Sequence, residues 1–314
     1  EVKFLYYRFN FFNKMINNLM ASTIPLLPKW FVRFFSSPYV AGETIEQVLG
    51  HVKNINDEGF SATIDILGEH VLDTDTSYEI TADYCELYDK ISQMSLDCNL
   101  SIKPTHLGLD LSIDTALKNF ESITFKAKES SNFLRLDMES SLHTDNTYKI
   151  FSFCKNIYPN VGVVLQAYLK RSIADIERLA KPGFNLRICK GIYKENSTIA
   201  YHDPGDIRNN FLRLVETMIR KEAYACFATH DQYLIDRILD IIIKRNISND
   251  KFEFQVLYGV PMGGRLEQLI NSGYRVRVYV PFGSEWYEYS LRRLKENPDI
   301  AGYVIKNIFS RNSY

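Results

Sequence analysis

Two kinds of segment alternate along most of the chain: short apolar runs, and longer stretches in which apolar positions recur about one helical turn apart. Residues 44–58 have the helical pattern, and the apolar run at 62–67 that follows is typical of a buried strand. Residues 206–220 also have the helical pattern, with apolar residues about one helical turn apart at Ile207, Phe211, Leu214, Val215 and Met218. The pattern predicts eight strands in all, at 62–67, 100–103, 133–137, 162–166, 186–190, 225–229, 252–257 and 276–280.

Eight strand and helix pairs within about 250 residues are typical of an α/β fold of the (β/α)₈ TIM type, in which each helix covers a parallel strand from outside. A doubly wound sheet is the alternative. That fold binds dinucleotides through a G-x-G-x-x-G turn after its first strand, and Gly259, Gly263 and Gly264 do not have this spacing. We therefore expect one barrel domain over residues 39–314.

Residues 1–38 have a different composition, in which bulky aromatic side chains such as Phe4 and Trp30 stand beside bases such as Arg8 and Lys14. One interpretation is an N-terminal helical arm docked on the barrel. The other is a contact with an anionic membrane surface, which suits interleaved basic and apolar residues. The sequence leaves both open.

Composition narrows the class of protein. The net charge of −1 offers no reason to expect a nucleic-acid partner, and 46% hydrophobic residues are ordinary for a globular protein. The five cysteines are an odd number without C-x-x-C spacing, which favours a reducing, cytoplasmic location over a disulfide framework. No run approaches about 18 apolar residues, so no membrane-spanning helix is expected.

Polar residues gather where the predicted strands end, and in this fold the chemistry sits at those ends. These residues are Lys103, Asp137, Glu139, Gln166, Arg187, Lys190, Thr229, His230, Gln255, Tyr258 and Tyr279, followed by Tyr289, Arg292, Arg293 and Glu296 on the last predicted helix. Burying so many cations is costly unless anions meet them. A pyrophosphate and a substrate carboxylate would satisfy this requirement.

The residues alone leave several roles open. Lys103 is a Schiff-base nucleophile or an ion-pair partner, and Asp137 is a candidate for that partner. Arg292, Arg293 and Glu296 could instead form a solvated helix face. His230 has no second histidine or cysteine at ligand spacing, so no metal site is expected.

Several ordered segments of the chain resemble the proline dehydrogenase family, which includes the proline-oxidising domain of bifunctional proline utilisation enzymes. The resemblance runs from about residue 39 to the C-terminal region. The segments are YVAGET at 39–44, LRLDME at 134–139, QAYLKR at 166–171, RICKGIY at 187–193, ATHD at 228–231, FEFQVLYG at 252–259 and YSLRRL at 289–294.

The resemblance implies a barrel whose last helix lies over the C-terminal ends of the strands and faces the substrate. It implies seven catalytic or substrate-binding residues: Lys103, Asp137, Leu257, Tyr279, Tyr289, Arg292 and Arg293. The two arginines, helped by the lysine, would hold the proline carboxylate, and the tyrosines and leucine would pack around the ring. Asp137 would pair near Lys103 and Arg292.

The resemblance also implies FAD as the cofactor. Its expected contacts are Gln166, Arg187, Lys190, Gly191, Thr229, His230 and Glu296. Gln166 and Arg187 would lie beside the isoalloxazine ring. Lys190, Gly191 and the Thr229-His230 pair would follow the ribityl and pyrophosphate part, while Glu296 would be a further contact from the last helix.

The activity that the resemblance implies is the first step of proline catabolism. L-Proline would be oxidised to Δ1-pyrroline-5-carboxylate by hydride transfer to flavin N5, and the electrons would pass to a quinone. A quinone acceptor implies a peripheral contact with the inner face of the cytoplasmic membrane, or the matrix side in mitochondria. Ile192 stands where relatives in the family commonly have a small residue. By the same resemblance, Tyr279 implies a preference for proline over hydroxyproline, because a smaller residue is common at this position in relatives that prefer hydroxyproline.

Two other functions fit parts of the same pattern. One is a lysine-dependent aldolase or lyase on a TIM-type barrel, with Lys103 or Lys190 forming the Schiff base. The other is a barrel without turnover that binds a small ligand or a membrane. The full set of clamp and flavin residues argues against the second.

Overall fold

The structure, a computed structural model, describes Arg33 and residues 38–296 of the chain. Apart from Arg33 and Pro38, the helical arm predicted for residues 1–38 lies outside the described part. The side chains of residues 292–296 also lie outside it, although their backbone continues the last helix.

Eight parallel strands close into a barrel in the order of the sequence. They are β1 (Ser61–Ile66), β2 (Cys98–Ile102), β3 (Leu134–Leu136), β4 (Val161–Gln166), β5 (Asn185–Cys189), β6 (Tyr224–Ala228), β7 (Phe252–Leu257) and β8 (Val276–Phe282). Closure comes from β1, which pairs with β2 on one side and with β8 on the other. The predicted barrel and all eight predicted strands are confirmed.

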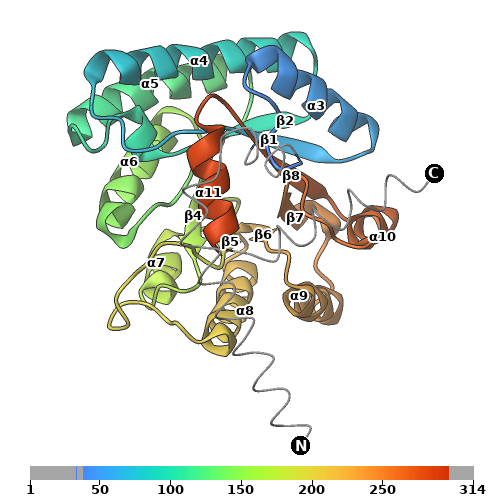
Figure 1. The fold of residues 1–314 in the computed structure, drawn as a ribbon. Coiled ribbons are helices and arrows are strands. Elements are labelled where there is room, and N and C mark those ends of the chain that lie inside the picture. Colours follow the sequence, from blue (N-terminus) through green and yellow to red (C-terminus); the bar gives the residue numbers. More distant parts are fainter. Residues whose placement is uncertain (1–32, 34–37, 297–314) are drawn as a thin grey trace, which may run out of the picture.

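A ring of helices surrounds the strands (Figure 1). The α-helices are α3 (Ile45–Asp57), α4 (Thr74–Gln93), α5 (Ile113–Glu129), α6 (Thr144–Ile157), α7 (Ser172–Leu179), α8 (Pro204–Arg220), α9 (Gln232–Lys244), α10 (Arg265–Asn271) and α11 (Trp286–Glu296). Short 3₁₀ turns are η2 (Pro104–Leu107), η3 (Ser141–His143) and η4 (Asn249–Lys251). The predicted helices at 44–58 and 206–220 correspond to α3 and α8.

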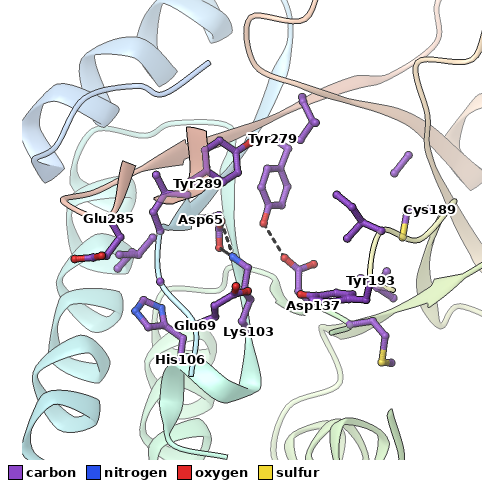
Figure 2. Close-up of a pocket in the computed structure, with 18 of the residues that line it drawn as sticks. Asp65, Glu69, Lys103, His106, Asp137, Cys189, Tyr193, Tyr279, Glu285 and Tyr289 are labelled. Atoms are coloured by element: carbon purple, nitrogen blue, oxygen red, sulfur yellow. Dashed lines mark hydrogen bonds and ion pairs between the residues drawn. The ribbon is translucent and has the colours of Figure 1, made fainter. Parts of the chain in front are cut away.

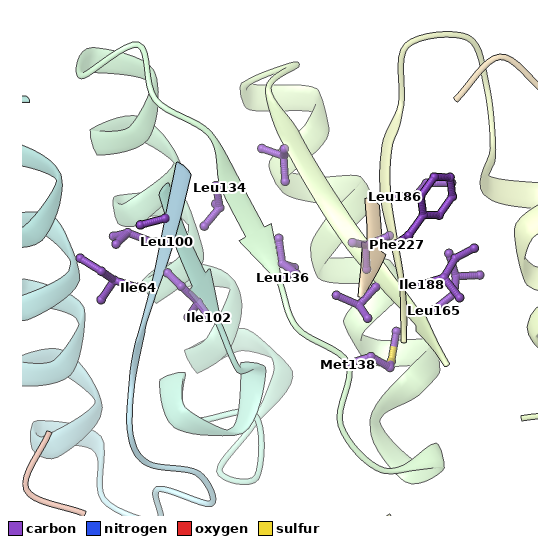
Figure 3. Close-up of a cluster of buried hydrophobic side chains, with 14 of the residues drawn as sticks. Ile64, Leu100, Ile102, Leu134, Leu136, Met138, Leu165, Leu186, Ile188 and Phe227 are labelled. Carbon is purple, nitrogen blue, oxygen red and sulfur yellow. The ribbon is translucent and has the colours of Figure 1, made fainter. Parts of the chain in front are cut away.

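The outward faces of the strands supply the apolar layer beneath these helices. Ile64, Leu100, Ile102, Leu134 and Leu136 have no exposed surface, and Figure 3 shows them side by side across the first three strands. Successive side chains on a strand point to opposite faces, so the residues between them point into the barrel. The apolar core of the protein therefore lies largely between strands and helices.

The inside of the barrel is polar, unlike the layers of branched apolar residues usual in this fold. Arg187 of β5 donates hydrogen bonds to Ser101 of β2 at 3.1 Å and to Asp137 after β3 at 2.6 Å. These strands are not neighbours of β5, so the bonds must cross the interior. These polar side chains alternate along the strands with the apolar residues that face outward.

A second layer of polar residues lies deeper inside. Arg277 of β8 donates to Glu253 of β7, with Nε and Oε1 2.9 Å apart, and both side chains are less than one-tenth exposed. Arg135 of β3 reaches across to β5 and donates to the Asn185 carbonyl at 3.2 Å. An isolated buried charge costs several kcal/mol, and pairing Arg277 with Glu253 reduces this cost.

Helix α11 covers the end of the barrel at which the strands finish. Glu288, Tyr289 and Leu291 of this helix line the same cavity as residues at the strand ends, and Figure 1 shows α11, in red, in front of the strands and inside the ring of helices. The predicted position of the last helix is therefore confirmed.

Candidate active site

A cavity of about 2000 Å³ occupies the C-terminal ends of the strands beneath α11, and we call it the mouth cavity. Typical small-molecule sites have about 300–1,000 Å³, so this one has room for a large cofactor and a substrate together. Eleven of the fourteen predicted site residues line it: Lys103, Asp137, Gln166, Arg187, Lys190, Gly191, Thr229, His230, Leu257, Tyr279 and Tyr289. Figure 2 shows several of them around one pocket.

The floor of the mouth cavity contains a buried ion pair between β1 and β2. Lys103 Nζ lies 2.7 and 2.8 Å from the two carboxylate oxygens of Asp65 (Figure 2). Burial raises the pKa of Asp65 to about 6 even though Lys103 favours the carboxylate. Burial also disfavours the charged form of Lys103, but Asp65 and Asp137 outweigh it and raise the lysine pKa. At neutral pH the two groups are therefore both charged.

The ion pair between Asp137 and Lys103 that the sequence left open is not formed, although the two charges lie close enough to influence each other. Asp137 pairs instead with Arg187, whose Nη1 lies 2.6 Å from Oδ1, and it accepts a hydrogen bond from the Tyr279 hydroxyl at 2.8 Å. Burial opposes ionisation of Asp137, but Arg187 and Lys103 outweigh it and hold its pKa below the usual range. The carboxylate that forms an ion pair with Lys103 is that of Asp65, near the end of β1.

Arg187 is the centre of a hydrogen-bonded set that continues into the barrel. Its guanidinium lies 5.3 Å from the centre of the Tyr279 ring, and its Nε donates to Gln255 Oε1 at 2.6 Å. Gln255 in turn donates to Glu253, the partner of Arg277. The orientation of Arg187 at the cavity floor is thus fixed by groups on several strands.

On the β5 and β6 side of the cavity, Asp231 caps a helix with one carboxylate oxygen and binds two cations with the other. Its Oδ1 accepts from the Tyr233 backbone N–H at 3.1 Å and so caps the start of α9. Its Oδ2 accepts from Lys190 and from Arg208, each at 2.6 Å. Two cations thus share one carboxylate, which leaves a surplus positive charge suited to an anion such as a pyrophosphate.

Thr229 and His230 follow β6 and join it to the end of β7. The Thr229 backbone N–H donates to the Gln255 carbonyl at 3.1 Å. The Leu257 backbone N–H donates to His230 Nε2 at 2.9 Å, so this nitrogen is an acceptor. Both predicted cofactor residues therefore have backbone-fixed positions on the cavity wall.

Gln166 lies at the end of β4 with only one of its amide groups satisfied. Its Nε2 donates to the Met138 carbonyl at 3.3 Å, whereas its Oε1 is buried and has no hydrogen-bond partner within the described structure. Leaving a buried acceptor unsatisfied costs about 1–3 kcal/mol. Such an oxygen suits a ligand that brings an N–H donor.

Gly191 begins the loop that carries Ile192 and Tyr193 along the cavity. Its φ is +99°, and a Cβ at this position would lie 2.0 Å from Cδ1 of Tyr168. Only glycine fits this close approach, because both the backbone conformation and the neighbouring ring exclude a side chain.

Arg292, Arg293 and Glu296 belong to α11, but their side chains lie outside the described part of the structure. Their roles, and the alternative of a solvated helix face, remain predictions. Tyr289, three residues before Arg292, lines the mouth cavity as predicted.

Asp65, Arg208 and Asp231 are among the charged residues of the site that had no role predicted from the sequence. For Asp65 a signal was present, because a single charge near the end of an otherwise apolar predicted strand is unusual. Arg208 lies on α8, far from any predicted strand end, and only the tertiary structure brings it to Asp231.

The lysines of the site are not arranged for Schiff-base chemistry. A nucleophilic lysine needs a lowered pKa, whereas Asp65 and Asp137 raise that of Lys103. Lys190 is held by Asp231 at 2.6 Å. The arrangement favours electrostatic binding of anions over nucleophilic attack by either amine.

Comparison with known proteins identifies the family of the chain. A family model described as proline dehydrogenase matches residues 48–306. Proline dehydrogenase 1 of Bacillus subtilis (strain 168) is 36% identical over 273 residues, which cover 87% of this chain and 90% of the relative. Proline dehydrogenase of Deinococcus radiodurans is 35% identical over 275 residues, covering 86% and 88%.

Among solved structures, proline utilization A (PutA) from Bdellovibrio bacteriovorus, inactivated by N-propargylglycine, matches with a TM-score of 0.77 and 23% identity. The match covers 84% of this chain and 32% of that one, and at this identity the likeness concerns the fold. Since the family model and both curated relatives match over most of its length, the chain belongs to the proline dehydrogenase family of oxidoreductases.

Proposed function

We propose that this protein oxidises L-proline to Δ1-pyrroline-5-carboxylate with bound FAD as the immediate electron acceptor, in the first step of proline catabolism. The observation that carries the proposal is the convergence of eleven predicted site residues on one cavity, from seven strands or the residues just after them and from helix α11. The names of the curated relatives support the same reaction.

The residues of the mouth cavity fit FAD. The unsatisfied Gln166 Oε1 suits an N–H of the isoalloxazine ring, and the surplus charge of Lys190 and Arg208 over Asp231 suits the pyrophosphate. Gly191, Thr229 and His230 would hold the ribityl part between these two ends, and Glu296 would contact the cofactor from α11. Bound FAD would supply the two-electron acceptor, at flavin N5, for the hydride from C5 of proline.

The charges on the cavity floor support a particular set of residues for binding the proline carboxylate. Lys103 is balanced by Asp65, and Arg187 by Asp137. These pairs leave little positive charge for the proline carboxylate, so we assign most of that contact to Arg292 and Arg293 on α11, with Lys103 assisting. Tyr279, Tyr289 and Leu257 would orient the ring, because holding the reacting carbon in place supplies much of the rate enhancement.

Ile192 and Tyr279 would set the size of the substrate site. Ile192 is 41% exposed and lines the mouth cavity. We propose that its bulk narrows the site and that Tyr279 disfavours a ring hydroxyl group. Comparing L-proline with trans-4-hydroxy-L-proline tests this, because Ile192→Ala should widen substrate choice while leaving proline the preferred substrate.

The acceptor that reoxidises the flavin is proposed to be a quinone in the cytoplasmic membrane, or in the inner mitochondrial membrane in a eukaryote. None of the helices within the described residues is long and apolar enough to span a bilayer. We propose a peripheral contact through residues 1–38, which lie almost entirely outside the described part. Sedimentation with anionic vesicles, with and without residues 1–38, tests this contact.

The first experiment is an anaerobic visible spectrum of the purified protein, reconstituted with FAD, before and after adding L-proline. We expect a flavin band that loses absorbance with L-proline but not with D-proline. Lys103→Met should raise the proline concentration needed by about tenfold or more, whereas Lys53→Met, on the exposed face of α3, should not change it.

The outcomes separate cofactor from substrate. A flavin band whose absorbance does not change with L-proline would support FAD as the cofactor but overturn the proposed substrate. Absence of any bound flavin after reconstitution would overturn the proposal as a whole. The proline amine must be neutral for oxidation, so single-turnover flavin reduction should accelerate as pH rises, and a flat profile would contradict this mechanism.

A further inference from the structure

Two histidines and an aspartate meet at the edge of the mouth cavity, outside the residues assigned to proline and FAD. His70 comes from the loop after β1, Asp110 from the turn between η2 and α5, and His143 from the end of η3. One ligand atom from each lies within 4.8 Å of the others. Asp110 Oδ2 lies 2.7 Å from His70 Nδ1, and Oδ1 lies 3.5 Å from His143 Nε2.

This donor set has a definite metal preference. Two imidazole nitrogens and one carboxylate suit zinc and neighbouring divalent transition metals, whereas magnesium and calcium prefer oxygen ligands alone. With metal–ligand bonds of about 2.0–2.1 Å, neighbouring ligand atoms in a tetrahedral site lie about 3.3 Å apart. The distance from Asp110 Oδ1 to His143 Nε2 already matches this spacing, whereas the shorter distance from Asp110 Oδ2 to His70 Nδ1 must lengthen when an ion binds.

The backbone holds the ligands in place. His70 has φ +56°, a conformation that non-glycine residues rarely adopt. Its N–H donates to Thr105 Oγ1 at 3.1 Å, and the next N–H, of Val71, donates to the Thr105 carbonyl at 3.1 Å. Glu139 accepts from the Thr105 N–H at 2.9 Å. Supporting contacts of this kind orient the first ligands of metal sites.

The surroundings leave one side of the cluster open. His143 is buried, whereas half of the His70 side chain is exposed and His70 lines the mouth cavity. Three protein ligands with an accessible fourth position are typical of sites that also hold water or a small ligand.

We propose that His70, Asp110 and His143 bind one divalent transition-metal ion of the zinc class at the edge of the mouth cavity. The ion connects three separate strand-to-helix loops, including the loop at residues 68–73 that lines the cavity. Zinc at about 100 times its dissociation constant stabilises the folded state by about 2.7 kcal/mol, which for a chain of this length is expected to raise the thermal midpoint by roughly 4 °C.

The test is equilibrium dialysis of the full-length, FAD-loaded protein against Zn²⁺, with zinc content measured by atomic emission. The wild type is expected to bind one ion per chain in the presence of millimolar Mg²⁺. His70→Ala and His143→Ala should each weaken binding by about tenfold or more. The matched control is His202→Ala, because His202 is a partly exposed histidine that contacts Glu195 rather than the cluster, and it should bind as the wild type does.

Equal zinc uptake by all four proteins, or none by the wild type, would overturn the site. If a histidine variant fails to fold, the wild type alone decides the question by diethyl pyrocarbonate labelling read by mass spectrometry. Zinc should protect His70 and leave the labelling of His202 unchanged. Unprotected His70 at saturating zinc would also overturn the proposal.

Discussion

Arg187 and Asp137 meet inside the barrel, with Nη1 and Oδ1 2.6 Å apart, although one belongs to β5 and the other follows β3. Both side chains are buried, and both line the mouth cavity. The pair therefore connects two strands that β4 separates and at the same time fixes two groups of the proposed active site.

Replacing Asp137 by asparagine tests what this pair contributes. Asp137→Asn keeps an acceptor for the Tyr279 hydroxyl but leaves the Arg187 charge without its carboxylate. We expect a loss of about 1.5–3 kcal/mol in the free energy of unfolding, together with a fall of about tenfold or more in kcat/KM for L-proline. Urea unfolding and steady-state kinetics measure the two effects.

The control for Asp137→Asn is Asp57→Asn, which removes an exposed partner of Lys53 on α3. Exposed pairs contribute about 0–1 kcal/mol, so this change should leave both quantities close to the wild-type values. A stable but inactive Asp137→Asn would assign the aspartate to the reaction alone. An active but unstable one would assign it to the fold.

The Arg277–Glu253 pair lies deeper and reaches the active site only through Gln255. Removing one partner of a buried pair costs about 3–5 kcal/mol, so Glu253→Gln should destabilise the protein by that amount at pH 7. The double change Glu253→Gln with Arg277→Met removes both charges and should recover much of the loss. Thermal midpoints of the wild type, of the single variants Glu253→Gln and Arg277→Met, and of the double variant complete the double-mutant cycle.

The effect of pH gives an independent check on this pair. Burial opposes ionisation of Glu253, but Arg277 outweighs it and lowers the pKa to about 2. The stabilisation is therefore fully present above the unfolded value of about 4.5 and is lost as pH falls from 4.5 towards 2. The difference between wild type and Glu253→Gln should shrink over that range. A difference that stays constant down to pH 3 would contradict the pairing.

The barrel was predictable from the sequence because its strands are short and apolar, because they alternate with stretches of helical periodicity, and because polar residues mark their ends. The same logic predicted that Lys103, Arg187 and Tyr279 would share a cavity. Both signals are local, since each depends on residues close together in the chain.

Pairing within the site was not predictable, because it depends on geometry across the barrel. Lys103 lies near two carboxylates. Only the closed structure shows that Lys103 forms its ion pair with Asp65, whereas Asp137 forms one with Arg187. The cluster of His70, Asp110 and His143 was missed for the same reason. Its members come from three separate loops and have no spacing that a motif could reveal.

Glu139 predicts an unusual dependence of stability on pH. Burial raises its pKa to about 7, although hydrogen bonds from Thr105 favour the carboxylate. A raised carboxyl pKa means that the folded state holds the proton more tightly than the unfolded chain. Stability from this group is therefore highest below pH 4.5 and falls by about 3 kcal/mol as pH rises to about 7.

The test compares the wild type with Glu139→Gln, which keeps an oxygen acceptor for the Thr105 N–H but cannot titrate. Asp65, whose pKa is also raised, to about 6, affects both proteins alike, so their difference isolates Glu139. Urea unfolding at pH 5 and pH 8 should show a smaller loss of stability in the variant. Parallel pH profiles would mean that Glu139 ionises normally in the folded protein.

Gly191 and Gly183 form a matched pair for testing the loop beside the proposed flavin site. Both have positive φ, +99° and +75°, so alanine at either position should cost about 1–2 kcal/mol from backbone strain. A Cβ at Gly191 also meets the Tyr168 ring at 2.0 Å, whereas at Gly183 nothing lies within 4 Å. Gly191→Ala must therefore displace either the ring or the loop that carries Ile192 and Tyr193.

We expect the two variants to lose similar stability from strain but to differ in cofactor binding. Gly191→Ala should weaken FAD binding by about tenfold or more, because the displaced loop lines the mouth cavity. Gly183→Ala, in the turn that leads into the opposite end of β5, should bind FAD as the wild type does. Fluorescence titration of the apoprotein with FAD measures this directly, and equal affinities in the two variants would remove the 191–193 loop from the cofactor site.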